Sequence, residues 1–182
     1  MQTHYETKRL VLQVLTPDYC HKVLDFYLSN KDIFQPHDPL YPKHYYTADY
    51  QYQSLSCDYH AFLERKGVRF YLFDKHHPQN IIGTVSFSNV SYGYANQAVV
   101  GYKLAKQHHH MGYAFEALQK AIELMFYEEK IHRITAYIMP DNEASIRLIE
   151  RLYFTYEGVA KEYALIQGKW EDHLQYALIN HL

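Results

Sequence analysis

A loop that opens a helix is the feature of this chain most able to bind a charged ligand. Residues 98–104 predict a strand, residues 107–112 a tight loop with one glycine, and Tyr113 to about Glu129 a helix. The first N–H groups of a helix lack internal partners and carry the positive end of the helix dipole, so they favour a phosphate. One glycine matches neither the dinucleotide fingerprint nor the P-loop, and most such units bind nothing.

A second helix entry follows this unit. Residues 133–138 predict a strand, and residues 140–145 open another helix. Asn142 and Ser145 lie three positions apart at this entry. Spacing alone predicts that they belong to a helix cap, which Asp141 or Asn142 would provide.

Three consecutive histidines, 108–110, occupy the first loop. Neighbouring residues on a tight loop cannot easily converge on one ion, and no second cluster of ligands is evident, so we expect no metal. Imidazoles beside a bound phosphate are a better interpretation, because their protonation would favour an anion.

Composition is that of an ordinary globular protein. The 182 residues, 48% hydrophobic and 21% charged, predict a single domain over residues 1–182. The net charge of −2 with no basic block gives little support for direct nucleic-acid binding. The 20 tyrosines and 13 histidines are unusual. They suggest amphipathic surfaces around a cleft, or equally a compositional bias.

Location is predicted from the cysteines and the apolar runs. Cys20 and Cys57 have no metal or redox spacing, which favours free thiols in a reducing compartment. The polar N-terminus lacks the apolar segment of a signal peptide. No apolar run approaches the roughly 20 residues that span a bilayer. We therefore expect a cytoplasmic protein without a membrane partner.

The elements around these motifs predict an α+β fold. In chain order we expect a strand at 9–14, a helix at 19–29, an irregular segment at 33–46, a helix at 47–65, strands at 68–73, 81–87 and 98–104, the helix and strand described above, a helix through 146–152, and strands at 159–166 and 170–179 joined by Gln167 and Gly168. The three central strands form an antiparallel meander. This order gives a three-layer α/β arrangement: a mixed, mostly antiparallel sheet of about seven strands with helices on both faces. The proline-rich segment 33–46 is either a loop over a cleft or a packed connector.

Several short motifs, spread over nearly the whole chain, belong together. They are residues 6–10, 81–83, 87–90, 101–102, Gly112 with 115–118, 131–134, 139–142 with Ser145, 157–158 with 160–163, and 168–173. This pattern resembles the GNAT superfamily of N-acetyltransferases, and within it the ribosomal-protein-alanine (RimJ/RimL-like) type. The resemblance implies a GNAT fold, acetyl-CoA as donor and an amine as acceptor, with direct transfer in a ternary complex.

The family's pyrophosphate loop has the pattern Gln/Arg-x-x-Gly-x-Gly/Ala. The resemblance places it on His109, His110, Met111, Gly112, Tyr113 and Ala114. This chain departs from the pattern at His109, where Gln or Arg is usual, and at His110, where many relatives carry glycine. Gly112, where a side chain would block the phosphate, is kept. We therefore expect acetyl-CoA binding to survive, at an equal or lower affinity.

The resemblance also implies roles around the thioester. Backbone groups of Tyr102, Lys103 and Leu104 would hold the pantetheine and the acetyl carbonyl beside a splayed sheet. Asn142 would lie near the pantetheine arm and Ser145 near the thiol, as a donor to the leaving thiolate. A glutamate near the position of Glu162 activates the amine through water in a related type. The tyrosine acid of many members is replaced here by Ile149.

Two other carboxylates and a polar-aromatic group have plainer interpretations. Glu116, on the helix after the loop, is expected to help hold that helix. Trp170, Asp172 and His173 form a dense group in one strand, which is more typical of a buried structural network than of a site.

The acceptor and the oligomeric state remain open. An α-amine at a protein N-terminus, as in a ribosomal protein, is the first hypothesis. A polyamine, amino sugar or antibiotic is the second, favoured by an acidic wall that Asp32, Asp38 and Asp49 would supply. The altered loop and the missing tyrosine allow a third, a non-catalytic CoA-binding module. Either a monomer or a homodimer fits the sequence.

Overall fold

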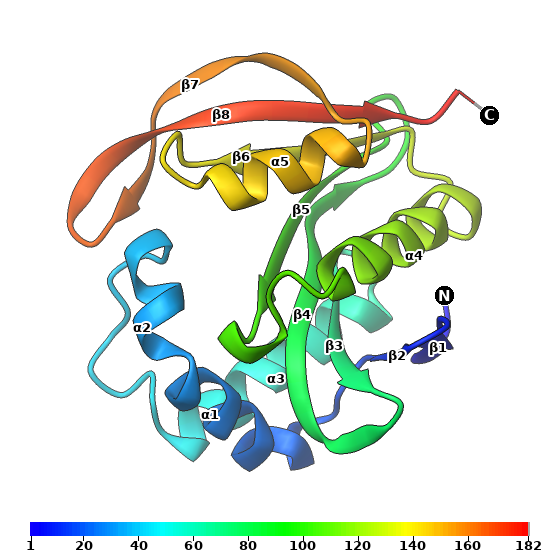
Figure 1. The fold of residues 1–182 in the computed structure, drawn as a ribbon. Coiled ribbons are helices and arrows are strands. Elements are labelled where there is room, and N and C mark those ends of the chain that lie inside the picture. The colour runs from blue at the N-terminus through cyan, green and yellow to red at the C-terminus, as the bar shows by residue number, and fades with distance from the viewer. Residues whose placement is uncertain (182) are drawn as a thin grey trace.

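The computed structural model describes residues 1–181, which fold around one eight-stranded sheet (Figure 1). The strand order is β1-β2-β3-β4-β5-β6-β8-β7, and only β5 and β6 pair in parallel. The strands are β1 (His4–Glu6), β2 (Leu10–Gln13), β3 (Val68–Asp74), β4 (His77–Ser91), β5 (Gln97–Leu104), β6 (Arg133–Ile138), β7 (Thr155–Ile166) and β8 (Lys169–Ile179). The mixed, mostly antiparallel fold class is confirmed.

Helices cover both faces of this sheet. They are α1 (Cys20–Ser29), α2 (Lys31–Phe34), α3 (Ala48–Leu63), α4 (Tyr113–Tyr127) and α5 (Glu143–Arg151), with 3₁₀ turns η1 (Pro17–Tyr19), η2 (Gln35–His37) and η3 (Lys106–His108). Figure 1 shows α4 and α5 in front of the sheet and α3 behind it.

Alternation along β3 divides the core between these two faces. Phe70 and Leu72 pack with the apolar stripes of α4 and α5. Tyr71 and Phe73 point the other way and pack with α1 and α3. Successive strand side chains alternate between faces, so one strand supplies both layers. Burying each such side chain contributes about 1.5–3 kcal/mol.

The sheet has one strand more than the seven expected. The additional strand, β1, is three residues long and pairs with β2. Its sequence, His-Tyr-Glu, has no apolar run, which is why the pattern does not reveal it. Residues 74–79, which include Pro78, predict a turn, and this turn is shorter in the structure because β4 begins at His77.

The helix α3 buries a polar side chain at one turn. Helical spacing with Leu55, Tyr59 and Phe62 predicts that Tyr52 faces the core, but Tyr52 is half exposed and Gln51 is buried in its place. Gln51 Nε2 donates a hydrogen bond to the carbonyl of Tyr45 at 2.7 Å. A polar side chain is stable there because the preceding loop supplies its partner.

The segment 33–46 combines both interpretations that the sequence left open. Tyr41 and Tyr45 stack with ring centroids 3.7 Å apart, and Tyr45 packs edge-on against Tyr27 of α1. The tyrosines therefore anchor a packed connector. The first part of the same segment, at Phe34 and Asp38, lines a cleft.

The C-terminal strands form the expected hairpin. Gln167 and Gly168 join β7 to β8, and both have positive φ, 47° and 85°, as a two-residue hairpin turn requires. The strand β7 starts at Thr155, four residues earlier than expected, and its register shifts between Ala160 and Ala164. In the described residues, no helix combines the length and apolarity needed to cross a bilayer.

Candidate active site

The cleft of the molecule opens where β5 and β6 separate. Their parallel pairing runs from Gln97 with Arg133 to Val100 with Ala136 and then stops. Both strands continue beyond it, to Leu104 and Ile138. The sheet therefore splays beside residues 101–104, as the resemblance implied, and among residues 1–181 no strand pairs with the backbone edge of β5 on that side.

A cleft of about 570 Å³ fills this splay. The predicted site residues that line it are Tyr102, Lys103, Leu104, His109, His110, Ala114, Asn142 and Ser145. Met111, Gly112, Tyr113 and Glu162 do not line it. A volume of this size suits an extended small molecule.

The loop from β5 to α4 forms one end of the cleft. Gly112 is the N-cap of α4 with a φ of 77°, a left-handed conformation that glycine adopts without strain. A Cβ there would lie 3.4 Å from Arg9 Nη2. His110 also has positive φ, 61°. His109 Nε2 lies 2.9 Å from the carbonyl oxygen of Leu104, so this ring ties the loop back to the end of β5.

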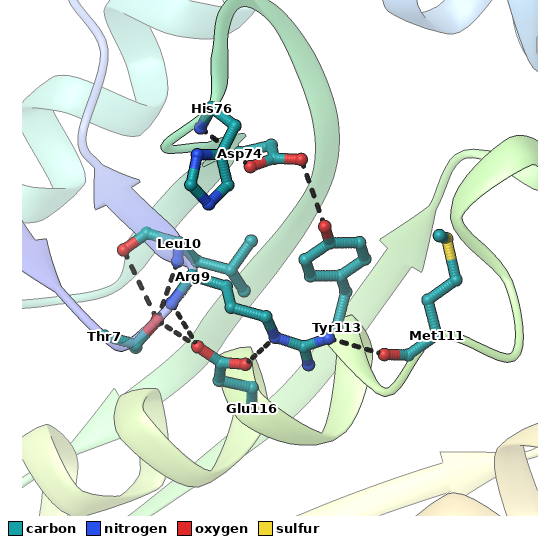
Figure 2. A network of polar contacts seen from close by, with 8 residues as sticks. All are labelled: Thr7, Arg9, Leu10, Asp74, His76, Met111, Tyr113 and Glu116. Atoms are coloured by element: carbon teal, nitrogen blue, oxygen red, sulfur yellow. Dashed lines mark hydrogen bonds and ion pairs between the residues drawn. The ribbon is translucent and has the colours of Figure 1, made fainter.

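A network from the N-terminal segment holds the loop and the first turn of α4 (Figure 2). Arg9 Nε donates to one Glu116 oxygen at 2.6 Å, while Thr7 Oγ1 and the Arg9 backbone N–H donate to the other at 2.6 and 2.8 Å. Arg9 Nη1 also donates to the Met111 carbonyl at 2.8 Å. Glu116 thus links α4 to the start of β2, the holding role expected for it.

The charge of Glu116 is stabilised in this network. Burial alone would raise the pKa of Glu116, but the hydrogen bonds from Thr7 and Arg9 outweigh burial and the pKa is lowered. Such charge-assisted hydrogen bonds are stronger than neutral ones. The loop is therefore fixed by an ionised carboxylate at neutral pH.

Tyr113, which does not line the cleft, makes a second set of contacts that hold the start of α4. Its ring lies 4.4 Å beneath the Arg9 guanidinium, and its hydroxyl donates to Asp74 Oδ2 at 3.0 Å. The backbone N–H of His76 donates to the other Asp74 oxygen at 2.9 Å and lowers the pKa of Asp74. Figure 2 shows Tyr113 linking the start of α4 to Asp74 at the end of β3, while Arg9 links the loop at Met111 to Glu116.

The other end of the cleft is the start of α5. Asn142 caps this helix, and its Oδ1 accepts a hydrogen bond from the backbone N–H of Ser145 at 3.1 Å. Tyr102 reaches across the splay and donates its hydroxyl to the Ser145 carbonyl at 3.2 Å. Burial raises the pKa of Tyr102 to about 12. Both Asn142 and Ser145 still line the cleft.

An ion pair lies on the face of the sheet that carries α1 and α3. Lys103 pairs with Asp38, and both lie in the cleft wall. Burial lowers the pKa of Lys103, against the effect of Asp38. Asp32 and Asp49 are exposed and lie outside the cleft lining. The three carboxylates that would favour a polyamine therefore do not form one wall. Of the three, Asp38 alone lines the cleft, and Asp38 is already paired with Lys103.

The hairpin tip closes this part of the cleft from above. Gln167 Nε2 donates to the Asp38 carbonyl at 3.0 Å, and Pro39 bridges to Ile166. Segments far apart in sequence thus meet here, and Figure 1 shows the β7–β8 tip beside α2.

Glu162 and His173, on the last two strands, lie differently with respect to the cleft. Glu162 lies in the bulge of β7 with a φ of 45°, is exposed and does not line the cleft. His173 of β8 is buried and lines the cleft. Trp170 is 58% exposed, so the expected buried network does not form as a unit. Side chains alternate between the two faces of a strand, so Trp170 and His173 must face opposite sides of β8. This alternation is the signal in the sequence that could have separated His173 from Trp170.

Metal ligands are not gathered at this site. No group of three or more His, Cys, Asp or Glu residues that could hold an ion occurs in residues 1–181. Cys20 and Cys57 are both free thiols, the first buried and the second exposed.

A splayed mixed sheet, with a loop and helix N-terminus at one end of the splay, defines a class of acetyl-CoA-dependent enzymes. The acetyltransferase (GNAT) domain model matches residues 9–155. The chain belongs to the GNAT acetyltransferase family.

Comparison with individual proteins shows which enzymes of this family the chain is similar to. The chain is 36% identical to [ribosomal protein uS5]-alanine N-acetyltransferase of Escherichia coli K12, over 94% of this chain and 88% of the relative. The crystal structure of ribosomal-protein-S5-alanine acetyltransferase from Vibrio fischeri superposes with a TM-score of 0.93 at 28% identity, covering 99% of this chain and 98% of that one. Mycobacterium smegmatis RimJ in complex with CoA-disulfide shares the fold, with a TM-score of 0.87 at 22% identity over 93% and 81%.

Proposed function

We propose that this protein transfers the acetyl group of acetyl-CoA to the N-terminal α-amine of a protein, and that its acceptor is an N-terminal alanine of ribosomal protein uS5. The observation that carries the proposal is the 36% identity, over 94% of the chain, to an enzyme named for that reaction. The cytoplasm is the proposed location, and free Cys20 and Cys57 suit its reducing conditions.

Acetyl-CoA fits the described cleft by its chemistry. The N-terminus of α4 offers unpaired N–H groups and the positive end of a dipole to the pyrophosphate. His109 and His110 stand beside it in the cleft lining. The unpaired edge of β5 at Tyr102, Lys103 and Leu104 offers backbone groups to the pantetheine amides. Asn142, on the opposite wall, completes the donor site.

Transfer follows directly from this placement. The amine must be neutral to attack, and an α-amine, with a reference pKa of about 8, needs less help than a lysine at about 10.4. Backbone N–H groups at the splay polarise the acetyl carbonyl. The Ser145 hydroxyl, which makes no hydrogen bond to residues 1–181, protonates the departing thiolate. The pathway needs no covalent nucleophile.

Acceptor competition tests the proposal. The purified protein, acetyl-CoA and four acceptors would be incubated separately and analysed by mass spectrometry: a lysine-containing peptide with N-terminal alanine, the same peptide with its α-amine formylated, spermidine and an aminoglycoside. We expect one acetyl group on the α-amine of the first peptide and none on the formylated one. Acetylation of the formylated peptide at lysine, or of spermidine or the aminoglycoside in preference to the first peptide, would overturn the proposed acceptor.

A further inference from the structure

His173 is an ionisable residue of the cleft lining to which the proposed function gives no task. It lies on β8 one position before Leu174, which pairs with Ile138 of β6. One further step in that register brings His173 level with Met139, where β6 has already left β5. The imidazole is therefore beside the splay, and its side chain is only 7% exposed.

The hydrogen bond of His173 selects one tautomer. Nδ1 lies 3.1 Å from the backbone carbonyl oxygen of Glu171. A carbonyl only accepts, so Nδ1 carries the hydrogen of the neutral ring. Nε2 makes no hydrogen bond to residues 1–181 and keeps its lone pair. Since His173 lines the cleft, this nitrogen is available to a group bound there.

The bulge of β7 fixes the ring in place. The register shift between Ala160 and Ala164 brings Tyr163 against His173, with ring centroids 5.1 Å apart. Tyr163 also stacks on Tyr137 of β6 at 4.1 Å and 15°. Bulges often re-aim side chains next to active sites. Here the two tyrosines hold the imidazole in one orientation.

Alternation of side chains along β6 and β8 places His173 on the face of the sheet that carries α1 and α3, which we take as the acceptor side. Ile138 and Leu174 pack toward α5, so Tyr137 and His173 point to the opposite face. Lys103 also points to that face and pairs with Asp38. Ser145, by contrast, is on the α5 side. The amine and the thiol would thus meet at the splay from opposite faces.

We propose that His173 Nε2 is the catalytic base that deprotonates the acceptor amine. The inference rests on the proposed transfer to an α-amine and deepens it. The lone pair of the neutral α-amine forms the C–N bond to the thioester carbon, and Nε2 takes one proton from that nitrogen as the bond forms. The C–S bond then breaks, sulfur gains one proton through Ser145 or water, and the imidazolium returns its proton to solvent.

Other titratable groups surround this imidazole. Tyr163 packs against the His173 ring, and Tyr137 stacks on Tyr163. Asp172 precedes His173 on β8, and the Lys103–Asp38 pair lies across the cleft. Asp172 is held by Lys161 Nζ at 2.7 Å and by the Glu162 N–H at 2.9 Å, outside the cleft lining. Asp38 and Asp172 are thus paired with lysines. His37 also lines the cleft, with its Nε2 3.7 Å from Asp141 Oδ1, whereas His173 Nε2 has no such carboxylate partner in residues 1–181.

The pH dependence of kcat/KM for a peptide with N-terminal alanine tests the inference. In the wild type both the peptide amine and the imidazole must be deprotonated, so the acid limb of log kcat/KM approaches a slope of two. In His173→Gln only the amine titrates, and the slope falls to one while kcat falls about 100-fold. Added imidazole should restore part of the activity of His173→Ala. Acetyl-CoA affinity should stay unchanged in both variants.

His60→Gln is the matched control. His60 Nδ1 also contacts a backbone carbonyl, that of Ser56 at 2.7 Å, but on the exposed side of α3. This variant should keep the wild-type rate and slope. An unchanged slope in His173→Gln would overturn the role of His173. A wild-type slope of one would also overturn it, and that measurement does not depend on whether a variant folds. Absence of transfer by the wild type would overturn the proposed function itself.

Discussion

Ser145 combines a structural and a chemical role that substitutions can separate. Its backbone N–H completes the cap of α5 by donating to Asn142, whereas its hydroxyl has no partner in residues 1–181. Ser145→Ala keeps the cap and removes only the hydroxyl. We expect kcat to fall about 10- to 100-fold with acetyl-CoA affinity retained, as measured by steady-state kinetics and calorimetry. Full activity in this variant would show that the hydroxyl does not protonate the thiolate.

Asn142→Ala provides the complementary substitution. It removes the cap acceptor and should lower the free energy of unfolding by about 1 kcal/mol, seen as a fall in Tm of about 2–4 °C. Ser145→Ala should leave Tm within about 1 °C of the wild type. Equal destabilisation by the two variants would contradict the separation of cap from chemistry.

The stability of the fold depends in part on the contacts of Glu116 that link α4 to the start of β2. Glu116 has a lowered pKa in the folded protein, so its ionised form stabilises the fold at pH values above the ordinary carboxyl value of 4.5. That stability is lost as the pH falls through the lower folded value. Glu116→Gln should lower the free energy of unfolding by about 1–3 kcal/mol at pH 7. Its difference from the wild type should shrink below pH 4.5 in urea titrations.

Glu123→Gln on the same helix is the control for this titration. Glu123 is half exposed and pairs with Lys120 at 3.1 Å. Exposed pairs contribute little, so its substitution should change stability by less than about 0.5 kcal/mol. A Glu116→Gln difference that stayed constant down to pH 3, or that matched Glu123→Gln, would contradict the proposed network.

Sequence pattern succeeded for elements whose own periodicity carries the information. The helix α4 and the strand β6 lie where their apolar residues predicted, and the Gln167–Gly168 turn was evident from its residues. The strand β1 was missed because pairing with β2, and no feature of its own residues, makes it a strand. Gln51 was missed because its partner is a carbonyl of the preceding loop.

The two halves of the candidate site differed in the same way. The donor half comes from continuous segments, so the loop at 107–112 and the helix entry at 140–145 could be predicted from local sequence, and the family resemblance then placed the pyrophosphate loop on residues 109–114. The acceptor half is assembled from β5, β8 and the segment 33–46, which meet only in the folded chain. Its geometry depends on strand register and on the bulge at Glu162, and local patterns contain neither.

Whole-molecule function requires that the splay and the loop together bind acetyl-CoA. Gly112→Glu tests this directly, because it places a negative charge at the N-cap of α4, the helix whose first N–H groups are expected to hold the pyrophosphate. Gly93→Glu is the matched control. Gly93 has a φ of 86°, close to the 77° of Gly112, and lies in the β4–β5 turn with no atom within 4 Å of an added Cβ.

Calorimetric titration of acetyl-CoA into the wild type and both glycine variants is the most direct measurement. We predict micromolar binding by the wild type and by Gly93→Glu, and loss of binding in Gly112→Glu at an unchanged fold by circular dichroism. Binding of equal strength in all three proteins would contradict the placement of the donor at this loop. Absence of binding by the wild type would contradict the acetyl-CoA-dependent function itself.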